Sequence, residues 1–283
     1  FRAVLLGKGA GWKLKKIFLP PNSTFSHRLG GKVIPSDEAL EEVNEAAHSC
    51  GGIVLHDVIN NRHANSAIRK GADGLIAVAA GAGGHAGPLS PFALVQEIRE
   101  WFDGPLLLSG AIANGGAILA AQAMGADMAY IGSPFIATPE ARAVDEYKQM
   151  IADSTAKDVV YSNYFTGIHG NYLKPSIAKA GMDPDHLPEA DPSKMDFSKA
   201  SQPGAKAWKD IWGCGQGIAA IKGVVPAGEV VARLKREFAA ARARLADVGA
   251  HLPRNGGGLL RLVRHASAER RLPVDRLRRL VQQ

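Results

Sequence analysis

The sequence has few cysteines, and no metal-binding pattern surrounds them. Cys50 and Cys214 are the only two among 283 residues, and the chain contains neither a Cys-x-x-Cys pair nor a cluster of cysteine with histidine. A disulfide framework needs several cysteines, and a structural zinc site needs cysteine and histidine ligands at characteristic spacings. Neither is supported, so we expect two packed, reduced thiols and no metal site.

Long apolar runs are missing as well. No stretch of about eighteen uncharged apolar residues occurs, which is the length that a membrane-spanning helix requires. The first thirty residues lack a compact apolar segment followed by a small-residue cleavage site. We therefore expect a cytoplasmic protein without a membrane partner.

Acidic residues are scarce at both ends, so the formal charge of +7 is unevenly distributed. Residues 1–32 carry seven Lys and Arg and no acid, and residues 251–283 carry eight Arg against two acids, so residues 33–250 have a charge of −6. Proteins that bind single-stranded nucleic acid interleave aromatic residues with basic ones, and neither end does so. We interpret the ends as solvated tails and expect no nucleic-acid partner.

The central region alternates short apolar runs with helical stretches, as parallel βαβ units do. The runs are apolar without alternation, which is typical of strands covered on both faces. The four predicted strands are 53–56, 75–78, 106–109 and 128–131. Ser90-Pro91 and Thr138-Pro139 predict helix starts, because proline is tolerated at the first helical position.

Several helices are predicted in more detail. One begins at Ser36, and the helix after Ser90 is expected to point four side chains inward, namely Leu94, Val95, Ile98 and Trp101. The Gly-Ala-Asp turn occurs at 71–73 and again at 125–127, and each glycine is expected to end its helix in a left-handed conformation. A last amphipathic helix is expected to pack on the body through Val230, Leu234, Phe238, Ala241 and Leu245.

The pattern divides the chain into four segments. Residues 1–32 form an atypical basic segment, 33–160 hold the βα units, 161–248 form an excursion with the last helix, and 249–283 form an Arg-rich tail. Residues 161–204 are rich in Gly, Pro, Asp and Ser, so we interpret them as a lid over the mouth of a barrel.

Three glycine-rich loops follow predicted strands, where parallel α/β folds bind ligands. The first, 81–87, surrounds His85 with glycines, and an imidazole suits proton transfer. A solvated loop histidine is the alternative. The second and third, 109–116 and 132–134, are expected to bind an anion through main-chain N–H groups and a helix N-terminus.

These segments resemble the FMN-dependent nitronate monooxygenases (2-nitropropane dioxygenases). The resemblance covers roughly residues 50 to 240 and is strongest from 71 to 150. Flavin-dependent enoyl-acyl-carrier-protein reductases share part of it. The matching segments are 61–64, 81–87, 109–112, 125–127, 130–138 and 212–217.

The resemblance implies an α/β fold of the (β/α)8 TIM-barrel type and an FMN-dependent oxidoreductase that oxidises alkyl nitronates with molecular oxygen. His85 is the implied catalytic residue, beside the flavin ring, and acts as base or hydrogen-bond donor toward the substrate. The implied phosphate ligands are main-chain amides of Gly110, Ala111, Gly132 and Ser133. Further implied cofactor contacts are Gly83, Gly84, Ser109 and Gln216. The partners would be a small-molecule substrate and oxygen, and a homo-oligomer is compatible with this interpretation.

Two departures from the family pattern lead to further expectations. The first βα units are not recognisable in residues 1–50, so the barrel is expected to lack or alter them. Asp57 stands where many family members carry a lysine, and its carboxylate would repel a phosphate. The alternatives are an enoyl reductase that uses NAD(P)H and a non-catalytic partial barrel.

Overall fold

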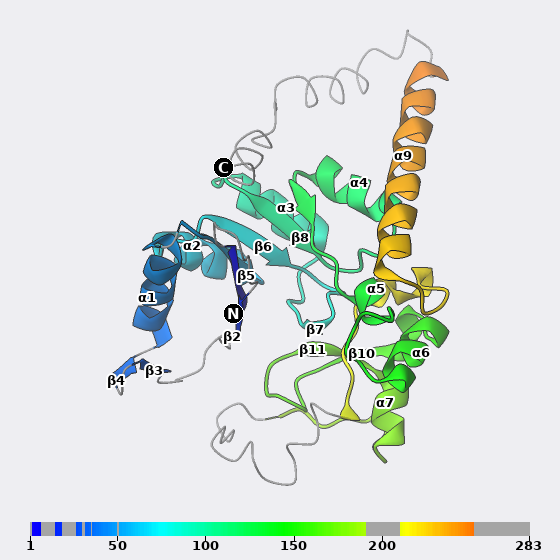
Figure 1. Cartoon of the computed structure of the whole chain (residues 1–283), viewed down its shortest axis with the longest axis horizontal. Helices are drawn as coiled ribbons and strands as arrows, with labels where there is room; N and C mark the ends of the chain where they lie inside the picture. Colours follow the sequence, from blue (N-terminus) through cyan, green and yellow to red (C-terminus); the bar gives the residue numbers. More distant parts are fainter. Residues whose placement is uncertain are drawn as a thin grey trace.

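The computed structural model describes residues 2–6, 15–18, 27–29, 32–34, 36–49, 51–190 and 210–251. Cys50, most of the basic N-terminal segment and the Arg-rich tail beyond residue 251 lie outside these ranges. The helices and strands are labelled in Figure 1.

A six-stranded sheet forms the centre of the molecule, with the strand order β2-β1-β5-β6-β8-β9. Four of its strands are parallel and run in chain order, as the sequence predicts. They are β5 (Ile53–Val58), β6 (Gly74–Val78), β8 (Leu106–Ser109) and β9 (Met128–Ala129).

The altered start of the barrel is also observed. Two strands pair antiparallel beside β5: β1 (Arg2–Leu6) pairs directly with it, and β2 (Lys15–Phe18) pairs with β1. A regular barrel begins with parallel βα units there. Over the described residues the sheet is open, so the predicted TIM-barrel-like α/β fold with altered first units is confirmed.

Helices alternate with the parallel strands along the chain and cover one face of the sheet, with α3 and α4 above it in Figure 1. Their bounds are α1 (Ser36–Ser49), α2 (Asn61–Arg69), α3 (Pro91–Arg99) and α4 (Gly115–Met124). Along β6, Leu75 and Ala77 belong to the core under the helices, and Ile76 and Val78 belong to a separate core on the opposite face. Unalternating apolar strands are therefore buried on both faces.

Of the two helix starts predicted from a proline, the one at Ser90-Pro91 is confirmed and the one at Thr138-Pro139 is wrong. Ser90 caps α3 by accepting the N–H of Phe92, and Leu94, Val95 and Ile98 are fully buried. The helix expected at Thr138 is wrong. The short helix α5 (Ser133–Ile136) ends just before it, and α6 (Asp145–Asp153) begins seven residues after it.

Side-chain hydrogen bonds explain this error and the wrong placement of Trp101. The Thr138 hydroxyl donates to the carbonyl of Phe135 at 2.9 Å, so it satisfies the end of α5 instead of opening a helix. Trp101, predicted to point inward, lies beyond the end of α3 with 37% of its surface exposed. Its indole N–H donates to Asn61 at 2.7 Å, which keeps the ring at the surface.

A second, three-stranded antiparallel sheet lies below the main one in Figure 1. It consists of β7 (Gly84–His85), β10 (Val159–Ser162) and β11 (Gly170–Leu173), with β11 in the middle. Short elements flank it: η1 (Ala156–Asp158), α7 (Lys174–Lys179) and η5 (Gln216–Ala220). A separate hairpin joins β3 (His27–Leu29) to β4 (Lys32–Ile34). Residues 191–204 of the predicted lid lie outside the described residues.

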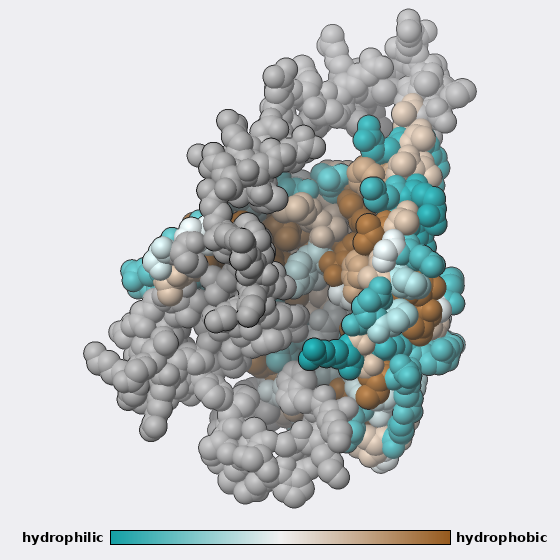
Figure 2. All heavy atoms as spheres, viewed as in Figure 1, coloured by the Kyte–Doolittle hydropathy of each residue, from teal (hydrophilic) through white to brown (hydrophobic). Residues whose placement is uncertain are grey.

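The long helix α9 (Ala227–His251) packs against α4 and runs along the right side of Figure 1. Val230, Leu234 and Ala241 are buried, as expected. Leu245 is 57% exposed, against expectation, because it lies near the far end of this helix. Figure 2 shows hydrophilic residues along much of that right-hand edge. No helix among the described residues has both the length and the apolar content to span a bilayer.

The repeated Gly-Ala-Asp turn has the same structure at both positions. Gly71 and Gly125 have φ values of 87° and 111°, which confirms the predicted left-handed helix ends. In each turn the aspartate carboxylate accepts the main-chain N–H of the preceding strand: Asp73 accepts from Val54 at 2.6 Å, and Asp127 accepts from Leu106 at 2.8 Å. The turn therefore fixes each new strand beside the previous one.

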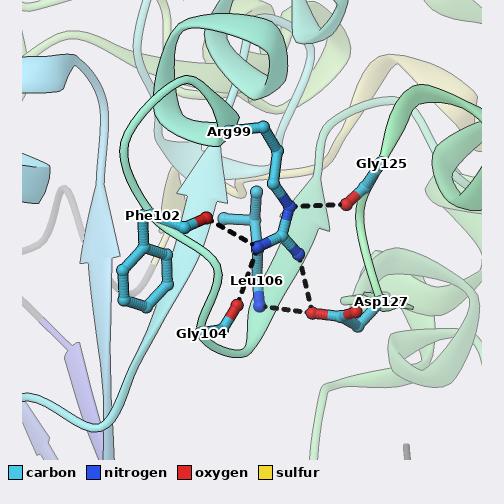
Figure 3. A network of polar contacts seen from close by, with 6 residues as sticks. All are labelled: Arg99, Phe102, Gly104, Leu106, Gly125 and Asp127. Atoms are coloured by element: carbon cyan, nitrogen blue, oxygen red, sulfur yellow. Dashed lines mark hydrogen bonds and ion pairs between the residues drawn. The ribbon is translucent and has the colours of Figure 1, made fainter. Parts of the chain in front are cut away.

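A basic side chain from the helix before the previous strand contacts the aspartate of each turn. At the first turn this is His48, and at the second it is Arg99, whose guanidinium binds Asp127 at 2.7 Å (Figure 3). Arg99 also donates to the carbonyls of Phe102, Gly104 and Gly125. These carbonyls belong to the segments that follow α3 and α4, so Arg99 joins the end of α3 to the second turn.

Candidate functional site

The loop that follows β6 connects three segments of the chain through one carbonyl group. The oxygen of Gly81 accepts the N–H of Ala111 at 3.1 Å and the N–H of Gln216 at 2.9 Å. Gly81 has φ = 82°, a conformation that glycine adopts at little cost. The loops after β6 and β8 and the segment at η5 are thereby held together.

The loop after β8 contains a strained residue at its centre. Ala111 has φ = 53°, and it is the only non-glycine with positive φ among the described residues. Such conformations cost roughly 1–3 kcal/mol and cluster at binding sites. Its neighbour Gly110 has no room for a side chain, because a Cβ atom would lie 2.9 Å from the carbonyl oxygen of Ala80.

The N-terminus of α4 differs from the expectation that it binds a ligand anion. The N–H of Gly115 donates to the carboxylate of Glu237 on α9 at 2.8 Å, and Asn114 accepts the N–H of Ala117 at 2.8 Å. A protein carboxylate thus takes the place that a bound anion takes at other helix N-termini. The predicted anion contacts that this carboxylate leaves open lie ahead of the helix, in the loop itself.

These loops surround a hollow of about 270 Å³, part of it open to solvent. Its lining contains no charged side chain and consists mostly of glycine and alanine. The lining residues are Gly81, Ala82, Gly83, Ser109, Gly110, Ala111, Ile112, Ala113, Tyr130, Gly132, Ser133, Gly215 and Gly217. Six of the predicted cofactor contacts are among them. The predicted contacts Gly84 and Gln216 do not line it, but Gly84 follows Gly83 and Gln216 lies between Gly215 and Gly217. The predicted catalytic residue His85 does not line it either.

The hollow presents main-chain donors. Within the part of the chain that the structure describes, no protein acceptor takes the N–H of Gly110, Gly132 or Ser133. Ala111 differs from expectation, because its N–H is used by Gly81. The Ser133 hydroxyl accepts the N–H of Gly215 at 2.9 Å, which leaves its own proton for a ligand.

Asp57 does not line this hollow. It lies within β5, opposite Ile76 of β6. The lining of the hollow therefore does not contain the carboxylate that was expected to repel a phosphate.

The segment that contributes Gly215 and Gly217 is supported from behind. Tyr147 stacks on Trp212 with ring centroids 5.0 Å apart, and its hydroxyl donates to the carbonyl of Gly213. Cys214 is fully buried, and burial raises its pKa to about 12. Cys214 therefore remains a neutral, packed thiol, as predicted, and is no nucleophile.

His85 lies at the edge of the second sheet. It belongs to β7 and pairs with Gly170 of β11, two residues along the chain from Gly83 in the hollow. Its Nε2 atom lies 2.9 Å from the Oγ1 atom of Thr166. The imidazole is half-buried, so it is held by the protein and is no solvated loop histidine.

Some site residues were missed by the sequence reasoning. Gly215, Gly217 and Tyr130 line the hollow, and Thr166 contacts His85. The first three lie within segments that carry the family resemblance, so a signal for them was present. For Thr166 there was none, because it lies 81 positions after His85 in an irregular stretch.

Comparison with known proteins gives a consistent result. A family model described as nitronate monooxygenase matches residues 31–237. A nitronate monooxygenase of Paraburkholderia phytofirmans is 29% identical over 219 residues, which cover 72% of this chain and 58% of that protein. One of Neurospora crassa is 26% identical over 217 residues, covering 70% of this chain and 57% of that protein. The chain thus spans little more than half the length of these relatives.

Solved structures agree on the fold. A nitroalkane oxidase from Streptomyces ansochromogenes has a TM-score of 0.60 and 28% identity, covering 72% of this chain and 62% of that chain. FabK from Thermotoga maritima also has a TM-score of 0.60, at 23% identity, covering 74% of this chain and 68% of that chain. At that identity the second likeness concerns the fold alone.

Proposed function

Because this chain belongs to the nitronate monooxygenase family, we propose that it is an FMN-dependent oxidoreductase that oxidises alkyl nitronates, or the nitroalkanes they derive from, with molecular oxygen. The family is generally flavin-dependent. The observation that carries the proposal is the hollow lined by main-chain donors and free of carboxylates, beside a positioned histidine.

The hollow suits a phosphate group. Gly110, Gly132 and Ser133 offer main-chain N–H groups, and Ser133 offers a hydroxyl, so an anion is bound without any buried charge of the protein. A side chain at Gly132 would meet nothing within 4 Å, which leaves space for a ligand at that position. The hollow is small and partly open to solvent, so it suits the phosphate end of FMN and not the whole cofactor.

The flavin, when bound, supplies the redox chemistry, and the protein supplies position and proton transfer. His85 is the residue for the second task. With a neutral nitroalkane its imidazole accepts the proton on the carbon that bears the nitro group, and with a nitronate anion its protonated form donates a hydrogen bond. An imidazole suits this role because it exchanges protons near neutral pH.

The test uses the protein as purified. We expect a yellow protein with one FMN per chain that consumes oxygen with propionate 3-nitronate and does not oxidise NADH. Bleaching of the flavin by NADH would favour the enoyl-reductase alternative instead. A colourless protein without FMN would favour the non-catalytic partial barrel, because an incomplete barrel loses its cofactor.

A further inference from the structure

The loop between β10 and β11 contributes a hydroxyl group to the surroundings of His85. Thr166 is 7% exposed, and its Oγ1 atom has two partners at 2.9 Å: the Nε2 atom of His85 and the carbonyl oxygen of Ile168. The N–H of Ile168 lies 3.4 Å from the same oxygen. Together these three contacts determine the direction in which the hydroxyl proton of Thr166 points.

A count of protons determines the direction of the contact with His85. A threonine hydroxyl has one proton, and a carbonyl oxygen can only accept. The proton of Thr166 must therefore point to Ile168, and its oxygen lone pairs face the imidazole. Nε2 is then the donor in the contact with Thr166. In the neutral ring the proton is on Nε2, and the lone pair is on Nδ1.

We propose that Thr166 is a positioning residue that keeps the proton of neutral His85 on Nε2, so that Nδ1 is the atom that accepts the substrate proton. The catalytic half of this inference rests on the proposed function. A neutral imidazole with its proton on Nε2 can be protonated only at Nδ1. The C–H bond of the nitroalkane breaks, its proton binds to Nδ1, and its electron pair remains on the substrate as the nitronate.

The imidazolium formed in this step is stabilised by the same contact. Its Nε2–H still donates to Thr166, and a hydrogen bond from a charged donor is stronger than one from a neutral donor. Thr166 thus favours the charged product of proton abstraction over the neutral starting state, which is the condition for accelerating the step.

The loop that carries Thr166 is held against the histidine loop at Ala86, the residue after His85. The N–H of Ala86 donates to the carbonyl of His169 at 3.2 Å, and the hydroxyl of Tyr161 donates to the carbonyl of Ala86 at 2.8 Å. The rings of Tyr161 and His169 stack 4.9 Å apart. Thr166 therefore meets His85 in a fixed geometry, as orientation of a catalytic group requires.

Nitrogen NMR on the purified protein with ¹⁵N-labelled histidine rings measures the position of the proton directly. His85→Gln assigns the His85 signals by their disappearance. We expect the wild-type ring to show the Nε2–H tautomer, Thr166→Ser to keep it, and Thr166→Val to give a mixture of both tautomers. A wild-type ring with its proton on Nδ1 would overturn the proposal whatever the activity of the protein.

Kinetics with the same variants supply the second measurement. We expect Thr166→Val to lower kcat on a neutral nitroalkane about tenfold, the factor that one hydrogen bond of ordinary strength supplies, with little change in KM. Thr166→Ser should restore most of the rate, and the preformed nitronate, which gives up no proton, should be oxidised at nearly the wild-type rate by all variants.

Ser162→Ala is the matched control. It removes a hydroxyl at the end of β10, just before the same loop, one that accepts the N–H of Tyr164 and does not contact His85, so activity and tautomer should be unchanged. Equal kcat and equal spectra for Thr166→Val and wild type would refute the positioning role. A wild-type protein with the Nε2–H tautomer and no nitroalkane turnover would refute the proposed function alone, while the assignment of the proton would stand.

Discussion

His85 is positioned by main-chain pairing on one side and by Thr166 on the other, so its imidazole can be removed without disturbing the backbone. We expect His85→Ala to keep FMN bound and to lower kcat/KM on a neutral nitroalkane by about 10², the usual effect of losing a general base. The effect on a preformed nitronate should be smaller, because no proton is abstracted there. An oxygen electrode measures both rates.

The control for this variant is His186→Ala. The His186 side chain is 83% exposed and pairs only with Asp183 in the part of the chain that the structure describes, so its loss should leave both rates unchanged. Wild-type activity in His85→Ala would remove His85 from the mechanism.

Gly132 tests the phosphate site without disturbing the fold. Its φ of −121° is open to any residue, and a methyl group there would meet no protein atom within 4 Å. Because Gly132 lines the hollow, the methyl group of Gly132→Ala occupies ligand space. We expect normal folding and at least a tenfold weaker affinity for FMN, measured by flavin fluorescence on reconstitution. A change of 1.4 kcal/mol in binding free energy corresponds to that factor.

Gly223→Ala provides the matched comparison, because a methyl group there also meets nothing within 4 Å and Gly223 does not line the hollow. If both variants retain FMN equally, Gly132 is not part of the phosphate site.

At the scale of elements, the two Gly-Ala-Asp turns offer a comparison within one molecule. Arg99 and Asp127 have side chains only 10% and 4% exposed, whereas those of His48 and Asp73 are 39% and 38% exposed. Breaking a buried pair leaves an uncompensated charge and costs about 3 kcal/mol or more, whereas an exposed pair contributes about 1 kcal/mol or less. We therefore expect Asp127→Asn to lower the free energy of unfolding by about 3 kcal/mol and Asp73→Asn by about 1 kcal/mol.

Urea unfolding at neutral pH measures both losses. Either asparagine keeps an oxygen that can accept the strand N–H, so the difference between the variants isolates the contact with the basic partner. Equal losses would mean that the Arg99 pair contributes no more than the exposed one.

Local patterns predicted the elements that depend on local interactions. The unalternating apolar runs gave the four parallel strands, Ser90-Pro91 gave the start of α3, and the glycines of the repeated turn gave the ends of α2 and α4. The Thr138-Pro139 pair failed because a threonine hydroxyl can satisfy the end of one helix as well as the start of another.

Long-range contacts escaped prediction. The three-stranded sheet joins β7 to strands more than seventy positions later, and Glu237 of α9 reaches the N-terminus of α4 across 122 positions. No pattern within a window of ten or twenty residues contains such pairings. Six of the thirteen residues that line the hollow could be predicted as cofactor contacts, because they lie at or after strand ends. The partner that orients His85 could not.

At the scale of the whole molecule, the sheet is open where a regular barrel would be closed. The antiparallel pair β1 and β2 covers one side of β5, and β9 is the last strand on the other side among the described elements. The hollow nevertheless lies entirely among loops after β6, β8 and β9 and the segment at η5. The proposed phosphate site therefore depends on the half of the barrel that is regular, which is why the altered first units are compatible with the proposed cofactor site.

The pH dependence of global stability follows from a histidine in the middle of the main sheet. His56 of β5 has neighbours in β1 and β6 and is fully buried. Burial, with the charge of Lys70 as a smaller cause, lowers its pKa from 6.5 to about 4. Between these two values the unfolded chain binds a proton that the folded protein does not, so stability is complete above about pH 6.5 and declines as the pH falls toward 4.

The slope for one such group is about 1.4 kcal/mol per pH unit, which adds up to about 3 kcal/mol at most. Urea unfolding at pH 7.5 and pH 5 should therefore show a smaller loss of stability for His56→Leu than for the wild type, by about 2 kcal/mol. The exposed His186 serves again as the control, since His186→Ala should retain most of the wild-type slope. If His56→Leu and wild type lose the same stability between the two pH values, His56 is protonated in the folded protein, and the centre of the sheet must admit water.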